Sequence, residues 1–223
     1  GVFPGISGGW VFGKEKFMEP LQNIVSFAKL RASFGLNGNV NKDWVGNYTV
    51  QGAYGTNKYN GTTGYLLSSL PLSYLQWEKS QTFEVGLDLS FLENKINTNF
   101  TYYNRQTENK YASIPLPSSS GITSITSNNG KLQNKGLEFE VSFKALNNKD
   151  WKWDVSLNGA YNINKILELP NNGLERNRQN AQQVYSGRLL ADGTYEKIWV
   201  GGYQEGQRPG DIYAYKAEGI YQN

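Results

Sequence analysis

The chain has 223 residues, a formal net charge of +3, 14% aromatic residues, and neither cysteine nor histidine. Without cysteine there are no disulfides or thiolate metal sites, and without histidine there is no imidazole zinc ligand and no histidine general base. Because the charges are few and interspersed, we expect no nucleic-acid partner, and no motif calls for a cofactor. Abundant Gly, Asn, Ser, Thr and Tyr, without a sustained 3.6-residue apolar period, predict an all-β fold.

The N-terminal third of the chain predicts strands separated by irregular segments. Residues 2–20 indicate the end of a strand followed by a polar turn. In the next strand, around 28–34, Ala, Leu and Phe alternate with Lys, Arg and Ser, so one face is apolar and the other charged. Residues 37–74 form a long irregular segment with short strands expected near 48–50 and 64–67, and a loop of this length is expected to carry function.

The clearest strand signal is the run 82–91. Five apolar residues alternate there with five small or polar ones, which include Glu84 and Asp88. Since successive side chains of a strand point to opposite faces, this run has one apolar face and one wet face. A turn at 92–95 leads into a second alternating strand, 96–104. We predict a β-hairpin that is apolar outside and polar inside.

The rest of the chain repeats this arrangement of strands and loops. Further strands are predicted around 137–145, 151–163, 195–200 and 212–221. A five-residue turn separates the first two of these strands, whereas other connections are long and polar. The three long loops that we predict over the whole chain are 37–74, 106–134 and 168–194.

Short turns and long loops therefore alternate along the chain. This is typical of a transmembrane β-barrel, which has tight turns at the periplasmic rim and long loops outside the cell. The apolar rows are about nine or ten residues long, near the length that a tilted strand needs to cross a bilayer. Aromatic residues near strand ends fit the girdles of such barrels: Trp77, Tyr102, Trp151 and Trp153. A soluble β-sandwich shows the same alternation, with its apolar rows packed between two sheets, and stays the alternative.

Several motifs share the order and spacing of a known family. They are KLRASFGLNGN at 29–39, LQWEKSQTFEVGLD at 75–88, the hairpin segments 92–96 and 102–107, and NGKLQNKGLE at 129–138. In these motifs the chain resembles the SusC/RagA-type TonB-dependent outer-membrane transporters of Bacteroidetes. The resemblance extends over nearly the whole chain.

The resemblance implies that residues 1–223 are part of the β-barrel domain of such a transporter. We expect an antiparallel up-and-down meander of about eight strands, a partial segment of a barrel of about 22 strands around a plug. The plug, the TonB-contacting segment and the remaining strands are absent from it. No basic-then-apolar signal peptide opens the chain, so we expect a mature chain or an excised piece from the middle of the barrel.

The function that the resemblance implies is nutrient import across the outer membrane, with an oligosaccharide or a peptide as ligand. Import is expected to be energised by the TonB complex through the plug and to involve a SusD-like surface lipoprotein. Outer-membrane lipid is the remaining expected partner. A soluble secreted β-sandwich that binds glycans is the alternative function.

Aromatic residues of the first long loop are the candidate ligand-binding residues, because flat rings can stack on a sugar or hold a peptide side chain. They are Trp44, Tyr48, Tyr54, Tyr59 and Tyr65. Packing within the loop, or contact with a partner protein, is the other explanation for these rings.

Two pairs of carboxylates on strand faces invite comparison with a glycosidase: Glu84 with Asp88, and Glu138 with Glu140. In a barrel we interpret them as lumen charges paired with Lys or Arg on neighbouring strands. We therefore predict no enzymatic activity and no catalytic or metal-binding residues. A hydrolase that works with carboxylates alone needs two acids facing each other across a cleft.

Overall fold

In the computed structural model, residues 1–214 and residue 216 are described, and the fold is built almost entirely from strands. The strands are β1 (Gly5–Trp10), β2 (Val25–Asn39), β3 (Ala53–Tyr59), β4 (Thr62–Ser69), β5 (Glu78–Phe91), β6 (Ile96–Pro115), β7 (Ser124–Asn147), β8 (Lys152–Glu168), β9 (Gln182–Leu189) and β10 (Tyr195–Val200). Short 3-10 helices join them: η1 (Phe12–Lys14), η2 (Lys16–Leu21), η3 (Thr49–Gln51), η4 (Ser118–Ser120) and η5 (Glu175–Asn177). None of the described helices has the length and apolar character needed to cross a membrane.

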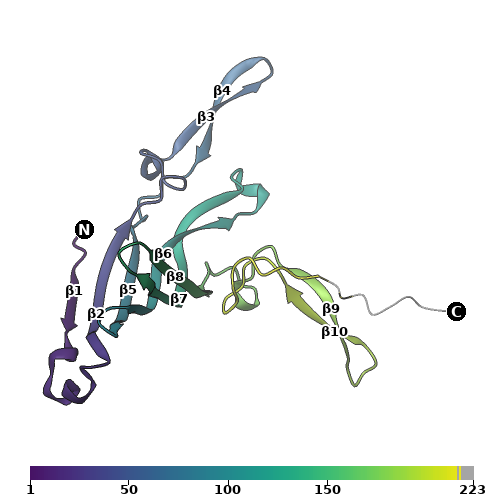
Figure 1. The fold of residues 1–223 in the computed structure, drawn as a ribbon. Coiled ribbons are helices and arrows are strands. Elements are labelled where there is room, and N and C mark those ends of the chain that lie inside the picture. Colours follow the sequence, from purple (N-terminus) through teal and green to yellow (C-terminus); the bar gives the residue numbers. More distant parts are fainter. Residues whose placement is uncertain (215, 217–223) are drawn as a thin grey trace.

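Six strands form one antiparallel sheet in the order β1-β2-β5-β6-β7-β8. Each of these strands pairs with the wall strand that precedes or follows it in the chain, so the sheet is an up-and-down meander (Figure 1). The sheet is open, as expected for part of a barrel. The hairpins β3–β4 and β9–β10 are separate two-stranded sheets. The first lies between β2 and β5 in the chain, and the second follows β8. The predicted all-β, antiparallel, partial-barrel architecture is confirmed, with wall strands and loop hairpins clearly distinct.

Two of the predicted loops contain regular structure. Residues 106–134 do not form a loop throughout, because β6 and β7 continue their pairing as far as Pro115 and Ser124. The loop 168–194 likewise contains β9, which pairs with β10. Polar Thr, Ser, Asn and Gln can make the same backbone ladder as apolar residues, and apolar periodicity does not detect such strands.

Two short strands were predicted at positions where the structure differs. Residues 49–51 form η3 in place of a strand, whereas the strand near 64–67 is confirmed as part of β4. Residues 212–214 belong to no strand. The remainder of the predicted strand 212–221, apart from residue 216, lies outside the described residues.

The sheet has an apolar face and a polar face, and the strand register carries both across all the wall strands. On the apolar face, Leu87 of β5 lies between Leu30 of β2 and Phe100 of β6, and Phe100 pairs with Phe139 of β7. One residue along each strand from Leu30, Leu87 and Phe100, the polar face begins: there Gly86 lies between Arg31 and Thr101.

The apolar face is not covered by a second layer in the part of the chain that the structure describes. Leu157 remains 63% exposed, Leu137 58% and Phe100 46%. A β-sandwich would bury these residues between two sheets. The exposed single layer is what a barrel wall requires, and it contradicts the sandwich alternative.

The connections alternate between the two ends of the sheet as predicted. Short connections join β5 to β6 (92–95) and β7 to β8 (148–151), and two 3-10 turns join β1 to β2 at the same end. In the first of these turns Leu92, Glu93 and Asn94 all have positive φ, which closes the hairpin tightly. At the other end lie the hairpin β3–β4, the tip of β6–β7 and the segment that leads to β9–β10.

Candidate functional site

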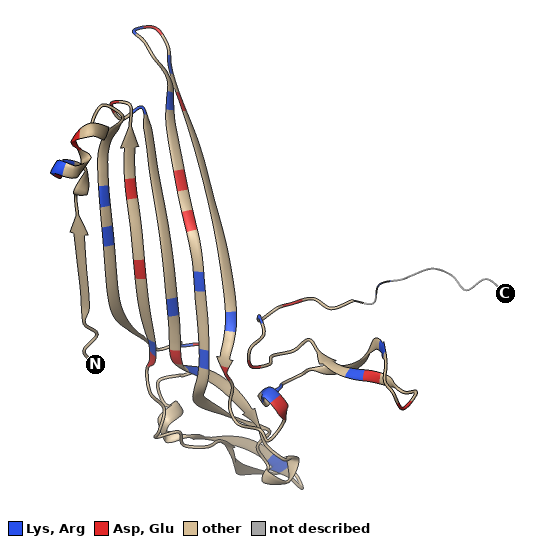
Figure 2. Ribbon diagram, turned by 90° about the horizontal axis from the view of Figure 1, so that it is seen from below, with Lys and Arg blue, Asp and Glu red and all other residues tan. Residues whose placement is uncertain are grey.

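The polar face carries a network of charges centred on Arg31. The guanidinium extends across β5 and donates hydrogen bonds to Glu84 Oε1 at 2.7 Å and to Thr101 Oγ1 at 2.6 Å. Its Nε lies 3.5 Å from Asp88 Oδ1, so one cation contacts both Glu84 and Asp88 of β5. Asn99 of β6 completes the network by donating to Asp88 Oδ1 at 2.7 Å. Basic β2 and acidic β5 lie next to each other in Figure 2.

The lack of a side chain at position 86 makes this network possible. Gly86 is the register partner of Arg31, and a Cβ built on Gly86 would collide with the guanidinium. The arginine side chain therefore lies flat over the glycine and reaches Glu84 on one side, Asp88 on the other and Thr101 beyond. A glycine usually weakens a strand, but at position 86 it allows the Arg31 guanidinium to approach the backbone closely.

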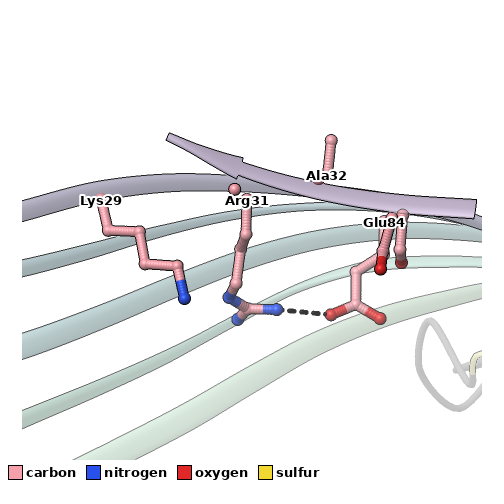
Figure 3. A pocket seen from close by; sticks show the side chains of 8 residues that line it. Lys29, Arg31, Ala32 and Glu84 are labelled. Atoms are coloured by element: carbon pink, nitrogen blue, oxygen red, sulfur yellow. Dashed lines mark hydrogen bonds and ion pairs between the residues drawn. The ribbon is translucent and has the colours of Figure 1, made fainter. Parts of the chain in front are cut away.

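A shallow cavity of about 390 Å³ lies beside this network, over β1 and β2. Figure 3 shows Lys29, Arg31 and Glu84 pointing to one side of the sheet, whereas Ala32 points to the other. Ser7, Gly8 and Gly9 of β1 also line the cavity. The Lys29 side chain passes over Gly9, whose Cβ position would lie 3.1 Å from Lys29 Cε. Cations and anions are both present here, so the cavity has no single charge preference.

The chemistry of the polar face is that of an ion-pair network. Glu84 and Asp88 share one guanidinium, as we predicted for lumen charges. Glu138 and Glu140 differ from that prediction, because they form no ion pair among the described residues, and their register neighbours on β6 are Thr101 and Asn99. No group of three or more metal-ligating side chains occurs in the described part of the chain.

A second polar cluster holds the loop end of the sheet together around a buried carboxylate. Glu78, only 4% exposed, accepts a hydrogen bond from the Tyr111 backbone N–H at 3.0 Å. Lys110 Nζ lies 3.4 Å from the same Oε1, and Asn39 donates to the other carboxylate oxygen at 3.4 Å. Glu78 thus connects β2, β5 and β6 at the point where the long loops begin.

The segment before Glu78 is fixed by side chains instead of by a strand ladder. The Asn128 amide accepts from Gln76 N at 2.8 Å and donates to Gln76 O at 2.9 Å and to Asn109 O at 2.8 Å. Tyr111 Oη also donates to Gln76 O, at 2.8 Å. We call Gln76, Glu78, Tyr111 and Asn128 the polar junction. It anchors the base of the β3–β4 hairpin to the β6–β7 hairpin.

Glu78 is one charged residue of the motif at 75–88, and the sequence does not reveal the polar junction. Its members lie up to 52 residues apart, and only the register of β5, β6 and β7 brings them together. The Asn and Gln residues beside the long polar hairpin indicate that side-chain hydrogen bonds form there, but they do not specify which residues pair.

The structure separates the five candidate loop aromatics into groups. Tyr54 on β3 and Tyr65 on β4 lie on one face of their hairpin, because Tyr54 pairs with Leu67 and Tyr65 with Thr56. Tyr59 has the opposite parity on β3 and lies on the other face. Trp44 and Tyr48 precede the hairpin, in the turn region before η3.

All five of these aromatic residues are exposed, from 40% for Trp44 to 86% for Tyr59. The described residues contain no ring contact among the five. The hairpin that carries Tyr54 and Tyr65 extends away from the sheet (Figure 1). The rings are therefore accessible from solution, and no aromatic cluster within the loop accounts for them.

Comparison with known proteins relates most of the chain to outer-membrane receptors. Residues 29–222 match the family described as TonB dependent receptor-like, β-barrel. The TonB-dependent receptor SusC of Bacteroides thetaiotaomicron is 33% identical over 177 residues, which are 76% of this chain and 17% of that protein. The TonB-dependent receptor P39 of Formosa agariphila is 29% identical over 226 residues, covering 100% of this chain and 19% of that protein.

Solved structures share the fold. A structure of the RagAB peptide transporter superposes with a TM-score of 0.72 at 24% identity, covering 88% of this chain and 24% of the other. A structure of the RagAB peptide importer in the closed-closed state gives the same TM-score over 93% of this chain. The chain spans about a fifth of the length of the curated relatives it matches.

Proposed function

The chain belongs to the family of TonB-dependent receptor β-barrels, which are proteins of the outer membrane, and from this premise we propose that it forms part of the wall and extracellular loops of a nutrient importer. The importer takes up an oligosaccharide or a peptide, is energised by TonB through a plug, and works with a SusD-like surface lipoprotein. The observation that carries the proposal is the single-layer sheet, exposed and apolar on one face, polar and charged on the other.

The height of the apolar face supports a membrane position. From Phe83 to Phe91 the row covers eight residue steps, about 27 Å at about 3.4 Å per step. A strand tilt of about 40° reduces this to about 21 Å along the membrane normal, close to the apolar band of about 25 Å in outer-membrane barrels. The row ends in the Leu92–Lys95 turn on one side and in polar residues on the other, so its limits agree with the two membrane boundaries.

The polar face supports transport better than catalysis. Glu84 and Asp88 are both held by Arg31, an arrangement that stabilises the wall and leaves no separate acid and base across a cleft. Hydrogen-bonding side chains of Asn, Ser and Thr continue over β6 and β8, and such a surface suits a hydrated passage. The relatives are also receptors and transporters by name. The role of the wall strands is therefore to enclose a passage, whereas the energy for import reaches the receptor through the plug.

For the loops, we propose that the β3–β4 hairpin contacts the ligand. Tyr54 and Tyr65 lie on one face with 74% of each exposed, so a flat sugar ring or a peptide side chain can stack between or beside them. Trp44 and Tyr48 extend the aromatic surface toward the base of the hairpin. The polar junction holds that base in place, which limits the entropy lost when the hairpin binds.

The experiment is uptake by cells that carry the full-length receptor, with fluorescent maltooligosaccharides and fluorescent casein peptides as the two probes. Outer-membrane fractionation first locates the receptor. We expect uptake of one probe class, loss of that uptake when TonB is deleted, and about a tenfold weaker binding in Tyr54→Ala/Tyr65→Ala. Tyr59→Ala, on the opposite face of the same hairpin, is the matched control.

Two results would contradict the proposal. If the receptor is found in a fraction other than the outer membrane, it is not an outer-membrane importer. If cells take up both probes equally well without the receptor and without TonB, the proposed import function is also excluded. Equal binding in the Tyr54/Tyr65 variant and the Tyr59 variant excludes only the ligand contact at this hairpin.

A further inference from the structure

The β9–β10 hairpin carries aromatic side chains along one of its faces. Lys197 of β10 pairs with Tyr185 of β9. Trp199 pairs in the same way with Gln183. Since side chains alternate along a strand, Tyr195 lies on the same face of β10 as Lys197 and Trp199. One face of the hairpin therefore presents three rings and a lysine.

The rings and two cations of this face contact each other directly. Tyr185 and Tyr195 meet edge to face, with their ring centroids 6.5 Å apart. Lys197 Nζ lies 5.4 Å from the centroid of the Tyr185 ring. The Arg178 guanidinium, from the segment before β9, lies 4.0 Å from the centroid of the Trp199 ring. Both cations are within cation–π distance of a ring. We call Arg178, Tyr185, Tyr195, Lys197 and Trp199 the cation–aromatic face.

Most of the cation–aromatic face is open to solvent. The hairpin stands apart from the six-stranded sheet (Figure 1). Tyr185 and Tyr195 are each more than half exposed, and Lys197 is exposed as well. From Tyr195 to Trp199 the face covers four residue steps, about 14 Å at about 3.4 Å per step. A surface of this length can contact more than one unit of an extended ligand.

The base of the hairpin is fixed by contacts with the segment before β9. The buried Gln204 donates from Nε2 to the Trp199 carbonyl oxygen at 3.3 Å. Gly202 has a positive φ, and a Cβ on it would collide with backbone atoms of residues 179–181. The end of β10 is thus packed against the segment that carries Arg178. Because Arg178 and Trp199 keep their relative position without a ligand, little entropy is lost when a ligand binds.

The cations of this face have binding capacity that the protein does not use. Arg178 and Lys197 form no ion pair among the residues that the structure describes. Within that part of the chain the guanidinium makes one hydrogen bond, from Nη1 to the Glu175 carbonyl oxygen at 3.3 Å, and its Nε is buried without a partner. A guanidinium has five N–H donors. The face therefore offers positive charge and spare donors.

Two acids of the hairpin are engaged away from this face. Glu196 alternates with Tyr195 and Lys197 and so points to the opposite side, where it accepts from Ser186 Oγ at 2.9 Å and lies 3.9 Å from Arg188. Asp192, in the turn at the tip, accepts hydrogen bonds from Thr194. The opposite face is neutralised within the hairpin, whereas the cation–aromatic face keeps its positive charge.

We propose that the cation–aromatic face binds acidic oligosaccharides, which are sugar chains with carboxylate groups. The exposed rings stack on the apolar faces of the sugar units, and Lys197 and Arg178 bind the carboxylates. Charge complementarity requires an anionic ligand. A sugar chain is favoured over an acidic peptide because every sugar unit presents a flat face to the rings, whereas a peptide has flat side chains only where its sequence places them.

This inference rests on the proposed function, because it needs the long loops to lie outside the cell. It deepens that function by naming the charge class of the ligand. It also adds a second contact surface, on β9–β10, to the one proposed on β3–β4.

The test measures binding of acidic hexasaccharides to the full-length receptor in detergent, by isothermal titration calorimetry. The probes are hexasaccharides of galacturonate, mannuronate and hyaluronan. The variant is Lys197→Gln, and the matched control is Arg188→Gln, which removes the same charge from the opposite face of the same hairpin. We expect at least one probe to bind, about fivefold more weakly in Lys197→Gln and unchanged in the control.

Two further substitutions test the rings and the guanidinium. Tyr195→Ala should weaken binding about fivefold, whereas Tyr195→Phe keeps the ring and should bind as the wild type does. Arg178→Lys keeps the charge but loses the planar fork of donors, and binding should weaken about tenfold.

Neutral and peptide probes identify the group that is recognised. Carboxyl-reduced hexasaccharides, in which each carboxylate is replaced by an alcohol, should bind the wild type at least tenfold more weakly than the acidic ones. Hexaglutamate should bind weakly. Tighter binding of hexaglutamate than of the sugars would overturn the proposal and assign the face to acidic peptides.

Three other results would also overturn the proposal. They are no binding of any acidic hexasaccharide, equal binding of the reduced ones, and equal binding in Lys197→Gln and Arg188→Gln. If Lys197→Gln loses the SusD-like lipoprotein but keeps full sugar binding, the face belongs to that partner instead. Failure of outer-membrane fractionation removes the proposed function as well, whereas these binding results leave it intact.

Discussion

Replacing Gly86 by alanine should destabilise the barrel wall, although alanine normally stabilises a strand relative to glycine. The usual gain is about 0.5–1 kcal/mol, from the lower backbone entropy of the unfolded chain. In this wall the new Cβ would occupy the position of the Arg31 guanidinium. Since the guanidinium is the end of a flexible side chain, it moves away, and the main cost is the loss of its hydrogen bonds.

The size of the effect follows from the contacts that Arg31 loses. Its hydrogen bonds to Glu84 and Thr101 are short, but the Arg31 and Glu84 side chains are 31% and 35% exposed, so we assign about 1 kcal/mol to each. The loss of about 2 kcal/mol exceeds the strand gain. Gly86→Ala should therefore lower the free energy of unfolding by about 1–1.5 kcal/mol.

A double-mutant cycle isolates this mechanism. In an Arg31→Ala background there is no guanidinium to displace, so Gly86→Ala should stabilise by about 0.5–1 kcal/mol, and the coupling energy should be about 2 kcal/mol. Gly35→Ala is the matched control, because Gly35 lies on the polar face of β2, as Arg31 does, and no atom is within 4 Å of its Cβ position.

The assay is guanidinium chloride unfolding of the full-length receptor in phospholipid vesicles, followed by tryptophan fluorescence. We expect the midpoint to fall for Gly86→Ala and to rise slightly for Gly35→Ala. If Gly86→Ala stabilises the wild-type and the Arg31→Ala receptor equally, the guanidinium does not lie over Gly86 and our reading of the polar face is wrong.

Three further predictions test other parts of the molecule. Leu157→Lys on the apolar face should destabilise the receptor in vesicles by about 2–3 kcal/mol. Asn158→Lys is one residue further along β8, on the polar face next to Glu140, and should cost less than about 1 kcal/mol. Equal unfolding midpoints for the two variants would contradict the assignment of the faces. Glu78→Ala leaves the Tyr111 N–H without its acceptor and should cost about 1–3 kcal/mol locally, seen as faster hydrogen exchange in residues 74–78 and 107–115. Glu196→Ala, on the separate β9–β10 hairpin, is the control and should leave exchange there unchanged. Hydrogen bonds from the Thr194 hydroxyl and N–H lower the pKa of Asp192 below its ordinary value of about 3.9, so this turn gains stability above that value and loses it as the pH falls through the lowered pKa; exchange of the Thr194 amide should show the loss, and Asp192→Asn should remove the pH dependence.

An open wall segment explains why so few residues of this chain are buried. Apart from glycines, only six apolar residues among those described are buried: Met18, Ala28, Leu72, Tyr111, Ile166 and Pro170. In a soluble protein of this size, apolar rows would pack against each other. In this wall the bilayer takes that place on one face, and strand pairing provides most of the contacts within the sheet.

The sequence alone determines the central parts of the wall strands and their faces. In the run 82–91 apolar and polar residues alternate strictly, and the period of two is a local property of any extended chain, so the faces follow without knowledge of the neighbours. The short turn at 92–95 and the long segments between hairpins also follow locally, because turn residues and the interruption of the alternation mark them. These features predict antiparallel strands and favour a barrel wall, but a β-sandwich shows the same alternation, and the choice between the two came from the family resemblance of the motifs.

Only the tertiary structure decides which polar residues meet. Arg31 contacts Glu84 and Thr101, which lie 53 and 70 residues away in the chain, whereas Glu138, on the same face, forms no ion pair among the described residues. A shift of one strand by two residues would preserve both faces and change every one of these contacts. Register is set by the summed pairing of whole strands and by the turns that join them, and so the Arg31 network and the polar junction emerge only when the strands are assembled.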